Sequence, residues 1–442
     1  MSAMQDRSIP SAVARLEAAL MRIHAPEAKN VFTTVFADAA RWEAEAADRR
    51  GAAGASRGPL DGRIVSVKAL FDVAGTVTSS GSAVLRALAP AVEDAEIVKR
   101  LRAAGAIVIG KTQMTEFAFS ALGTNPHDGM PGNPRDRTRV PGGSSSGAAV
   151  SVVERMVDIA IGSDTGGSLR IPAALSGAVG FKPTSGFVPT AGAFSLSSTL
   201  DTIGPIAASV EDCFVADQVL SGEVAPSRLR PASPGTFRLV VARGRLFDRC
   251  EPEVLAAFEN AMERLRSGGS QIKDGSIEAA LDDVARIDRI GTFPSIEVGA
   301  TLRSLGISEL DGIDPRTRVR IEAGARILGT DYVRMVRLRQ AAIRSFERCF
   351  GNNEAFVVPT TPIRAPLISS LVEDAAFHEL NGLVLRNPRV ANVLDCPSIS
   401  LPLPIEGLPV GLMLIGRRNA DRHLLEIASS IEMILRGNLR GT

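Results

Sequence analysis

Three stretches of the chain hold hydroxyl and amine side chains in a pattern that could support acyl transfer. The stretch PGGSSSGAAV, residues 141–150, places three adjacent serines behind two glycines, with Ser144 first. The stretch IVSVKALFDV surrounds Lys68 with apolar residues, where burial would lower its pKa and make the amine a base near neutral pH. The stretch SDTGGSLRIPA carries Ser168 behind two more glycines. These residue types suit a serine nucleophile that is activated by a lysine base.

The turn before Ser168 could also stabilise a developing negative charge. A Thr-Gly-Gly-Ser run, residues 165–168, can aim several backbone N–H groups at one point, as an oxyanion hole requires. Each stretch alone has a plainer interpretation. The Gly/Ser run is typical of a linker, Lys68 could pack its stem with its ammonium in water, and Ser168 could cap a helix.

Two other chemistries have weaker support in the sequence. A nucleotide site would need a G-x-x-x-x-G-K-[ST] loop or a G-x-G-x-x-G turn after a strand, and the chain has neither. A histidine-based hydrolase has only His24, His127, His378 and His423 to draw on, and the G-x-S-x-G elbow is absent. Because a Ser-His-Asp triad is defined by geometry, the sequence leaves that alternative open.

The elements around these residues alternate between strands and helices. Alternating β-branched residues predict a strand or strand pair over 61–73, and residues 95–112 read as a helix, a glycine stop and an apolar strand. Residues 147–156 turn helical, and residues 158–167 form a strand that runs into a glycine turn. Such alternation predicts an α/β fold with a mixed sheet.

The rest of the chain continues this pattern. We expect helices over 11–50 and mostly over 250–350, a buried strand in 354–366, two strands joined by a turn over 398–404 and 409–416, and a closing helix over 420–436. No clear linker interrupts the chain. We therefore expect a single domain over residues 1–442, with a helical N-terminal segment at about 10–50 and a helical insertion at about 250–350.

Composition excludes several classes of partner. The 442 residues carry a formal net charge of +1, so no global field attracts nucleic acid or an anionic membrane. The four cysteines lie far apart, without a C-x-x-C pair, which fits a reducing cytosol rather than a zinc site or a disulfide framework. The sequence shows no secretory signal and no long apolar run, so we expect a cytoplasmic protein. Its preference for arginine over lysine suggests a bacterial source.

Taken together, the motifs resemble those of the amidase signature family of Ser–Ser–Lys hydrolases. The resemblance is carried by VKALFDV, PGGSSSGAAV and GSDTGGSLRIPAALSGAVGFKPT, and the 24-residue separation of Ser144 and Ser168 matches the family's spacing. Further matching segments are GKTQMTEFAF, GNPRD, LDTIGPIAASVED, VVPTTP and CPSISLPLPIEGLPVGLMLIG, so the resemblance runs from about residue 10 to 435. It implies a large mixed β-sheet core covered by helices on both faces.

The resemblance also implies a role for each residue of the site. Ser168 would be the nucleophile, Lys68 the base, and Ser144 the serine that bridges them, after a cis peptide bond at Gly143–Ser144. The backbone N–H groups of Thr165, Gly166, Gly167 and Ser168 would hold the oxyanion. The implied reaction hydrolyses a small-molecule carboxamide to an acid and ammonia or an amine, through a seryl acyl-enzyme, without a metal or an organic cofactor.

The substrate pocket is less well defined. By resemblance it involves residues 119–124 and the region before Asn392, which gives the candidates Phe119, Gly123, Ser145, Arg386 and Arg389. We expect Arg386 or Arg389 to bind a carboxylate or another polar group, the alternative being that both point into solvent. Asp164, Arg170 and Asp201 are expected to form a structural ion-pair network. Ser146, Asp395 and Met413 stand where glycine, glycine and glutamine are common in the family, so no single relative supplies the substrate.

Two other functions stay open. The glutaminase component of a tRNA-dependent amidotransferase shares the core, but such proteins carry an acidic residue about ten positions before the C-P segment, where a rough alignment puts Leu385. A catalytically silent amide-binding protein is the alternative from another class. The expected partner is a small-molecule amide, and a homodimer is the default assembly.

Overall fold

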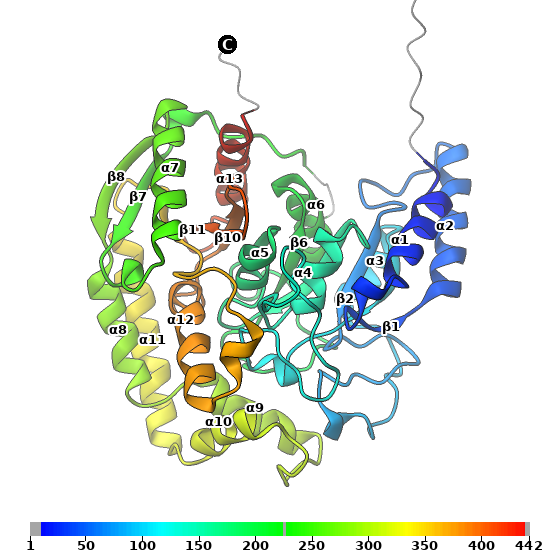
Figure 1. Cartoon of the computed structure of the whole chain (residues 1–442), viewed down its shortest axis with the longest axis horizontal. Coiled ribbons are helices and arrows are strands. Elements are labelled where there is room, and N and C mark those ends of the chain that lie inside the picture. The colour runs from blue at the N-terminus through cyan, green and yellow to red at the C-terminus, as the bar shows by residue number, and fades with distance from the viewer. Residues whose placement is uncertain (1–9, 224–226, 438–442) are drawn as a thin grey trace, which may run out of the picture.

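The computed structural model describes residues 10–223 and 227–437, and its centre is an 11-stranded sheet. The strand order is β1-β3-β2-β4-β6-β5-β10-β11-β9-β7-β8. Helices α1 and α2 lie at one end of the molecule and helices α8 and α11 at the other (Figure 1). The strands are β1 (Phe32–Val35), β2 (Ile64–Lys68), β3 (Ile107–Thr112), β4 (Ile159–Asp164), β5 (Val179–Lys182), β6 (Thr202–Ala207), β7 (Arg238–Arg243), β8 (Gln271–Ser276), β9 (Ala355–Pro359), β10 (Ser398–Pro402) and β11 (Gly411–Gly416).

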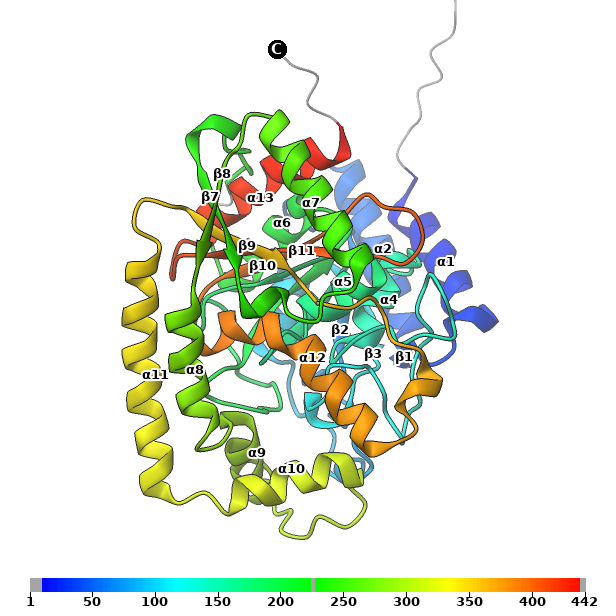
Figure 2. The ribbon, with the colours of Figure 1, turned by 60° about the vertical axis from the view of Figure 1, so that its left-hand side comes forward.

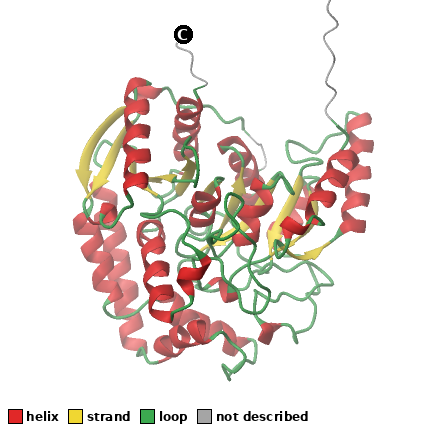
Figure 3. Ribbon diagram, viewed as in Figure 1, coloured by secondary structure: helices red, strands yellow, loops and turns green. Residues whose placement is uncertain are grey.

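Helices pack around this sheet (Figure 3). They are α1 (Ala12–Ile23), α2 (Ala37–Ala52), α3 (Glu96–Ala103), α4 (Ser146–Val153), α5 (Arg170–Ser176), α6 (Val210–Ser221), α7 (Pro252–Ser267), α8 (Glu278–Asp288), α9 (Phe293–Ser304), α10 (Pro315–Ala325), α11 (Gly329–Cys349), α12 (Asp374–Val393) and α13 (Asp421–Arg436). None of the helices within the described residues has both the length and the apolar composition needed to cross a membrane.

The sheet is mixed, as the alternation of elements predicts. Strand β2 runs parallel to both β3 and β4, and β7 runs parallel to both β8 and β9. The remaining neighbours are antiparallel. Since β2 and β4 are parallel neighbours, their carboxyl ends lie at the same edge of the sheet, so side chains that follow the two strands can meet there.

Alternation along the strands divides the core between the two faces of the sheet. On β2, Val65 and Val67 pack into a cluster with α3, α6, α7 and α13, whereas Ile64 packs into a second cluster with α1, α2, α4 and α5. On β7, Val240 and Ala242 face a third cluster, to which α8, α11 and α12 contribute. Helices therefore cover both faces, and the predicted α/β class is confirmed. That the whole chain forms one domain stays a prediction.

Most predicted elements around the candidate site are confirmed. Strand β2, helix α3 followed by β3, helix α4, strand β4 and the pair β10–β11 all lie inside the predicted ranges or within one residue of them. Two segments expected to be mainly helical are so, but each also contains a strand. The N-terminal segment contains β1 between its two helices, and the region 250–350 contains β8. Both are edge strands, and β8, with sequence QIKDGS, is mostly exposed, so neither has the apolar alternation that marks a strand.

Candidate active site

Lys68 is the last residue of β2, and its side chain is fully buried. Because side chains alternate along a strand, Lys68 shares the face of Ile64 and Ser66, and Ser66 contacts Ser151 of α4. Lys68 Nζ lies 2.7 Å from Ser144 Oγ and 2.9 Å from Ser163 Oγ. The strand thus delivers its amine to the loop just before α4.

The surroundings of Lys68 favour an uncharged amine. Burial lowers its pKa from 10.5 to about 7, although the negative charges of Asp164 and Asp201 act in the opposite direction. An amine with this pKa exchanges a proton with a neighbouring hydroxyl near neutral pH.

The loop that carries Ser144 is tightly packed. The Gly143–Ser144 peptide bond is cis, and Ser144 is fully buried. A Cβ atom at Gly143 would lie 2.8 Å from the backbone nitrogen of Gly123, so only glycine fits there. The adjacent Ser145 and Ser146 are also buried and bonded locally, to the carbonyl of Ser163 and to Gln113 respectively. The serine run is a fixed turn and not a linker.

Ser168 lies in the turn between β4 and α5, and the carboxylate of Asp164 organises this turn. Asp164 Oδ1 accepts the N–H of Gly167 at 2.7 Å, and Oδ2 accepts the N–H of Leu169 at 3.0 Å. Gly167 has φ +130°, a conformation that favours glycine. The carbonyl of Ser168 accepts the N–H of Ser145 at 3.3 Å, which joins the two serine turns.

The four predicted oxyanion donors do not lie in equivalent places. Thr165, Gly166 and Ser168 line the cavity described below, whereas Gly167 does not. The N–H of Gly167 is also already bonded to Asp164. Gly167 therefore shapes the turn, whereas Thr165, Gly166 and Ser168 line the cavity and stay the predicted oxyanion donors.

Asp164 and Arg170 form a fully buried ion pair behind the turn. Arg170 donates from Nη2 and Nε to the two oxygens of Asp164, at 2.9 and 3.0 Å, and it also bonds Asn392 and the carbonyl of Pro388 on α12. Burial alone would raise the pKa of Asp164, but the charge and hydrogen bonds of Arg170 outweigh it and lower the pKa to about 2. The pair fixes the Ser168 turn to α12.

Asp201 lies on the other side of the turn. It accepts the hydroxyl of Thr165 at 2.5 Å, the hydroxyl of Ser195 at 3.0 Å and the N–H of Ser197 at 2.9 Å. It makes no contact with Arg170, so the predicted three-residue ion-pair network is reduced to the Asp164–Arg170 pair. Burial raises the pKa of Asp201 to about 6.

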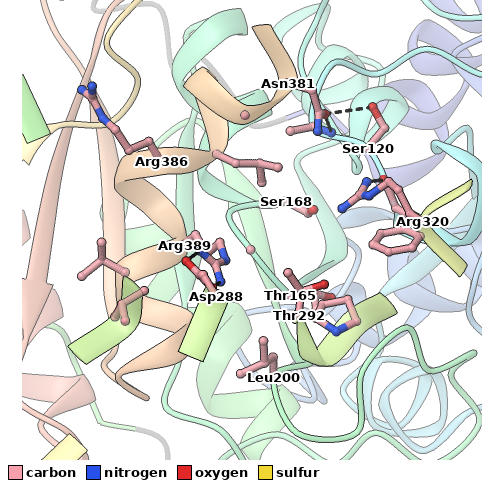
Figure 4. Close-up of a pocket in the computed structure, with 18 of the residues that line it drawn as sticks. Ser120, Thr165, Ser168, Leu200, Asp288, Thr292, Arg320, Asn381, Arg386 and Arg389 are labelled. Atoms are coloured by element: carbon pink, nitrogen blue, oxygen red, sulfur yellow. Dashed lines mark hydrogen bonds and ion pairs between the residues drawn. The ribbon is translucent and has the colours of Figure 1, made fainter. Parts of the chain in front are cut away.

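A cavity of about 580 Å³ opens at Ser168 (Figure 4). Its walls come from the Ser168 turn, the loop after β3, the segment that follows β7, and helices α8, α9, α10 and α12. Most of the lining is apolar; it includes Ala118, Phe119, Ala121, Leu196, Leu200, Leu246, Leu281, Val284, Ala285, Pro294, Leu385 and Val390. Its charged residues are Arg245, Asp288, Arg320, Arg386 and Arg389, with His378 as a further titratable group.

Three of the five predicted substrate-binding residues line this cavity, namely Phe119, Arg386 and Arg389. The other two, Gly123 and Ser145, do not line it. Gly123 packs against the serine loop, since a Cβ there would lie 2.7 Å from the carbonyl oxygen of Gly142. Ser145 is fully buried, and its hydroxyl donates to the carbonyl of Ser163.

Both predicted arginines are already engaged by the protein. The guanidinium of Arg386 donates to the carbonyls of Asp248 and Leu246, at 2.6 and 2.8 Å. Arg389 forms a two-point ion pair with Asp288, one contact of which measures 2.7 Å (Figure 4). In each arginine at least two guanidinium nitrogens therefore already bond the protein's own oxygen atoms, which leaves the group less available to a ligand.

Arg320, on α10, is a cavity residue that sequence reasoning missed. Its guanidinium lies 3.6 Å from the centroid of the Phe119 ring and donates to the Phe119 carbonyl (Figure 4). Among the described residues it pairs with no carboxylate. Burial, with the charge of Arg389 adding to it, lowers the pKa of Arg320 to about 10, so the group is still a cation at neutral pH.

Ser163 is a second residue that the sequence analysis passed over. It is the residue before Asp164 on β4 and the second partner of Lys68. Its position in GSDTGGS could have indicated the contact with Lys68, because β4 is parallel to β2 and ends beside Lys68. Arg320 had no such signal, since its contact with Phe119 spans 201 residues of the chain.

The histidines and acidic groups do not form another catalytic centre. Within residues 10–223 and 227–437, His378 is the one histidine that lines the cavity, where it is exposed to solvent. No group of three His, Cys, Asp or Glu side chains in these ranges is arranged to hold a metal ion.

Comparison with known proteins agrees with this geometry. The family model described as Amidase matches residues 14–425. The chain is 34% identical to a glutamyl-tRNA(Gln) amidotransferase component from Symbiobacterium thermophilum, over 96% of this chain and 93% of that protein. It is also 34% identical to 2-amino-5-chloromuconic acid deaminase of Comamonas testosteroni, over 92% of this chain and 88% of that protein. A solved amidase crystal structure superposes with a TM-score of 0.86 at 31% identity, covering 96% of each chain.

Proposed function

Because the chain belongs to the amidase (amidase signature) family, whose members act on carbon–nitrogen bonds, we propose that it hydrolyses a small carboxamide through an acyl-enzyme on Ser168. The observation that carries the proposal is the contact of Lys68 Nζ with Ser144 Oγ, 2.7 Å apart in a buried site. A lysine with a depressed pKa, a serine hydroxyl in contact with it and a second serine that lines the cavity are the parts from which a covalent acyl-transfer site can be built.

In the proposed mechanism the neutral amine of Lys68 takes the proton of Ser144, and Ser144 takes the proton of Ser168. Ser168 Oγ then attacks the amide carbonyl carbon. The oxyanion is stabilised by the amides of Thr165, Gly166 and Ser168, three residues that line the cavity in the turn that Asp164 holds through Gly167 and Leu169. The proton passes back through Ser144 to the leaving nitrogen, the C–N bond breaks, and water activated by the same relay releases the acid.

The cavity supports a substrate with an apolar body and a carboxylate. Its lining is mostly apolar. Of its charged residues within the described ranges, Arg320 is the one that has no carboxylate partner and donates to only one carbonyl, that of Phe119. A guanidinium with free N–H groups binds a carboxylate with two hydrogen bonds. One relative is named for a deaminase of an amino-chloromuconic acid, which is itself an acid. We therefore propose Arg320, and not Arg386 or Arg389, as the residue that binds the carboxylate.

The second candidate function is the glutaminase component of a tRNA-dependent amidotransferase. The relatives named as components of glutamyl-tRNA(Gln) amidotransferases favour it, since they match nearly the whole chain. Glutamine also carries an α-ammonium group, which a carboxylate would have to bind. Among the described lining residues Asp288 is the one carboxylate, and it is paired with Arg389. At the position suggested by resemblance, Leu385 packs near Gly166. The cavity therefore suits an amide without that ammonium group better.

The experiment that tests the proposal is ammonia release from a panel of amides, with wild type beside Ser168→Ala. The panel pairs neutral and carboxylate-bearing members: acetamide, benzamide, indole-3-acetamide, malonamate, a biuret-type ureide and glutamine. Turnover of an acidic amide by wild type, lost in the variant, supports the proposal. Turnover of glutamine alone would favour the glutaminase instead. A well-folded wild type that binds amides tightly without turnover would indicate a silent binding protein.

A further inference from the structure

Glu297, on α9, is a buried carboxylate that the mechanism above does not use. Its Oε2 accepts the hydroxyl of Ser197 at 2.5 Å and the N–H of Thr199 at 3.1 Å. Its Oε1 accepts the hydroxyl of Tyr332, on α11, at 2.7 Å, and also the hydroxyl of Thr199. No cation lies within ion-pair distance of it in the part of the chain that the structure describes. Its direct hydrogen-bond partners are hydroxyl and backbone N–H donors, and bonds to a carboxylate are among the stronger ones in proteins.

The loop held by Glu297 continues directly into the active site. It carries Leu196 and Leu200, which line the cavity, and it ends at Asp201. Ser197 joins the two carboxylates, since its hydroxyl donates to Glu297 while its N–H donates to Asp201 at 2.9 Å. Asp201 in turn accepts the hydroxyl of Thr165 at 2.5 Å.

These contacts form one continuous chain from the helices around 293–349 to the oxyanion turn. The order is Tyr332, Glu297, Ser197, Asp201 and Thr165, and every link is a hydrogen bond of 2.9 Å or less. Figure 2 shows α9 and α10 at the lower end of the molecule and α11 along its left side, away from the sheet centre. Thr292 and Pro294, at the start of α9, also line the cavity, so α9 adjoins the cavity as well as this chain of contacts.

We infer that Glu297 is a positioning residue for the oxyanion turn: through Ser197 and Asp201 it fixes Thr165, whose amide faces the developing negative charge. Donors of an oxyanion hole are effective only when they are aimed in advance, and small displacements of such groups are costly in rate. The inference rests on the proposed function, because it assigns Glu297 a role in the chemistry at Ser168.

The variants that test it are Glu297→Gln, Thr165→Val and the double variant. Glutamine keeps the shape of the side chain but removes its negative charge, so the contacts with Ser197 and Thr199 lose the strength that a charged acceptor gives them. Valine at 165 removes only the hydroxyl that Asp201 holds. Glu322→Gln, at a partly exposed position on α10 where Glu322 pairs with Arg318, is the control for the same chemical change.

The measured quantity is the rate at which a fluorophosphonate labels Ser168. This reaction needs an activated serine and an oxyanion hole, and it can be measured before the amide substrate is known. We expect Glu297→Gln to slow labelling between about 10-fold and 100-fold, the range that misplaced catalytic groups show. Thr165→Val should give a similar loss, and the double variant should be no slower than the slower single variant, because both changes cut one chain of contacts. Glu322→Gln should label like wild type.

Two results would overturn the inference. One is labelling of Glu297→Gln at the wild-type rate, and the other is a double variant whose two losses multiply. If Glu297→Gln does not fold, Ser197→Ala, which removes only the hydroxyl bonded to Glu297, replaces it in the same comparison. A wild type that the probe does not label would instead count against the proposed function, so the two failures are distinguishable.

Discussion

Lys68 and Ser144 are 76 residues apart in sequence, yet Lys68 Nζ and Ser144 Oγ lie 2.7 Å apart in a fully buried site. The contact exists because β2 ends beneath the loop that enters α4, and because Gly143 and Gly162 leave room for that loop. A Cβ atom at Gly162 would lie 2.7 Å from Ser145 Oγ. Most of the chemistry proposed for this protein depends on this one contact.

Removing any member of the Lys68–Ser144–Ser168 relay should abolish most activity. We predict that Lys68→Met and Ser144→Ala each lower kcat by about 10²–10⁴-fold, the usual contribution of a general base, and that Ser168→Ala leaves no acyl-enzyme. Because the three residues act as a unit, the losses should not multiply in double variants. Steady-state kinetics with the best amide of the panel measures this. Ser267→Ala, at the exposed end of α7, is the control, and full activity in Ser144→Ala would contradict the relay.

Activity should rise with pH through the titration of Lys68. Its pKa is lowered to about 7, so the amine is protonated and inactive below that pH and is a free base above it. We predict an acid limb in kcat/KM with a midpoint near pH 7. In Asp201→Asn the midpoint should move to lower pH, because a negative charge that raises the pKa of Lys68 is lost. A pH–rate profile that is flat between pH 5 and 9 would argue against lysine as the base.

Ser163 should contribute to the orientation of Lys68 and not to substrate binding. Its hydroxyl lies 2.9 Å from Lys68 Nζ, and it does not line the cavity. Hydrogen bonds between neutral groups contribute about 0.5–1.5 kcal/mol, so Ser163→Ala should lower kcat by about 2–10-fold. The KM should stay near the wild-type value. Ser163→Thr, which keeps the hydroxyl, should retain much of the activity, and a change confined to KM would contradict this role.

Arg320 should determine the preference for acidic amides. We predict that Arg320→Gln raises KM for a carboxylate-bearing amide by about 10–100-fold, the loss expected from a charged hydrogen bond, and leaves neutral amides unchanged. Arg386→Gln is the matched control, because the protein's own carbonyls hold that guanidinium. The assignment of Arg320 as the carboxylate-binding residue would be wrong if Arg320→Gln and Arg386→Gln raised KM equally. It would also be wrong if Arg320→Gln raised KM equally for neutral and acidic amides.

The buried pair of Asp164 and Arg170 should matter for folding. Arg170→Met leaves the carboxylate of Asp164 buried without its cation, and breaking such a pair typically costs about 3–5 kcal/mol of unfolding free energy. The direction in which the unfolding free energy changes with pH should also reverse in this variant. With Arg170 present, the low pKa of Asp164 stabilises the fold above about pH 4, and this stabilisation is lost as the pH falls toward about 2. Without Arg170, burial raises that pKa, so the variant should be more stable in acid than at neutral pH.

Denaturant unfolding at several pH values measures this prediction. The surface pair of Arg243 and Glu259 provides the control, because exposed ion pairs contribute little and Arg243→Met should change stability far less. A variant Arg170→Met as stable as wild type at pH 7 would show that the pair does not hold the turn.

The sequence could predict the residues whose partners are set by local motifs. Lys68, Ser144 and Ser168 each lie at the end of a strand or the start of a helix, and apolar alternation and glycine turns indicate those elements. The cis bond at Gly143–Ser144 is likewise implied by resemblance and is present. The edge strands β1 and β8 were missed because their exposed residues do not alternate.

The cavity walls could not be predicted in the same way. Arg320 reaches Phe119 only because α10 packs over the loop after β3, and nothing local to either residue indicates that contact. Arg386 and Arg389 were reasonable candidates by position, but their guanidinium groups are satisfied by Leu246, Asp248 and Asp288, all far away in sequence. Which of several arginines is free for a ligand depends on tertiary contacts.

The most direct test of the central claim is intact-mass analysis of the enzyme after an acid quench during turnover of its best amide. We predict a population heavier by the mass of the acyl group, with the adduct on the peptide that contains Ser168 and absent from Ser168→Ala. Steady turnover without an adduct, continuing in Ser168→Ala, would contradict an acyl-enzyme on Ser168.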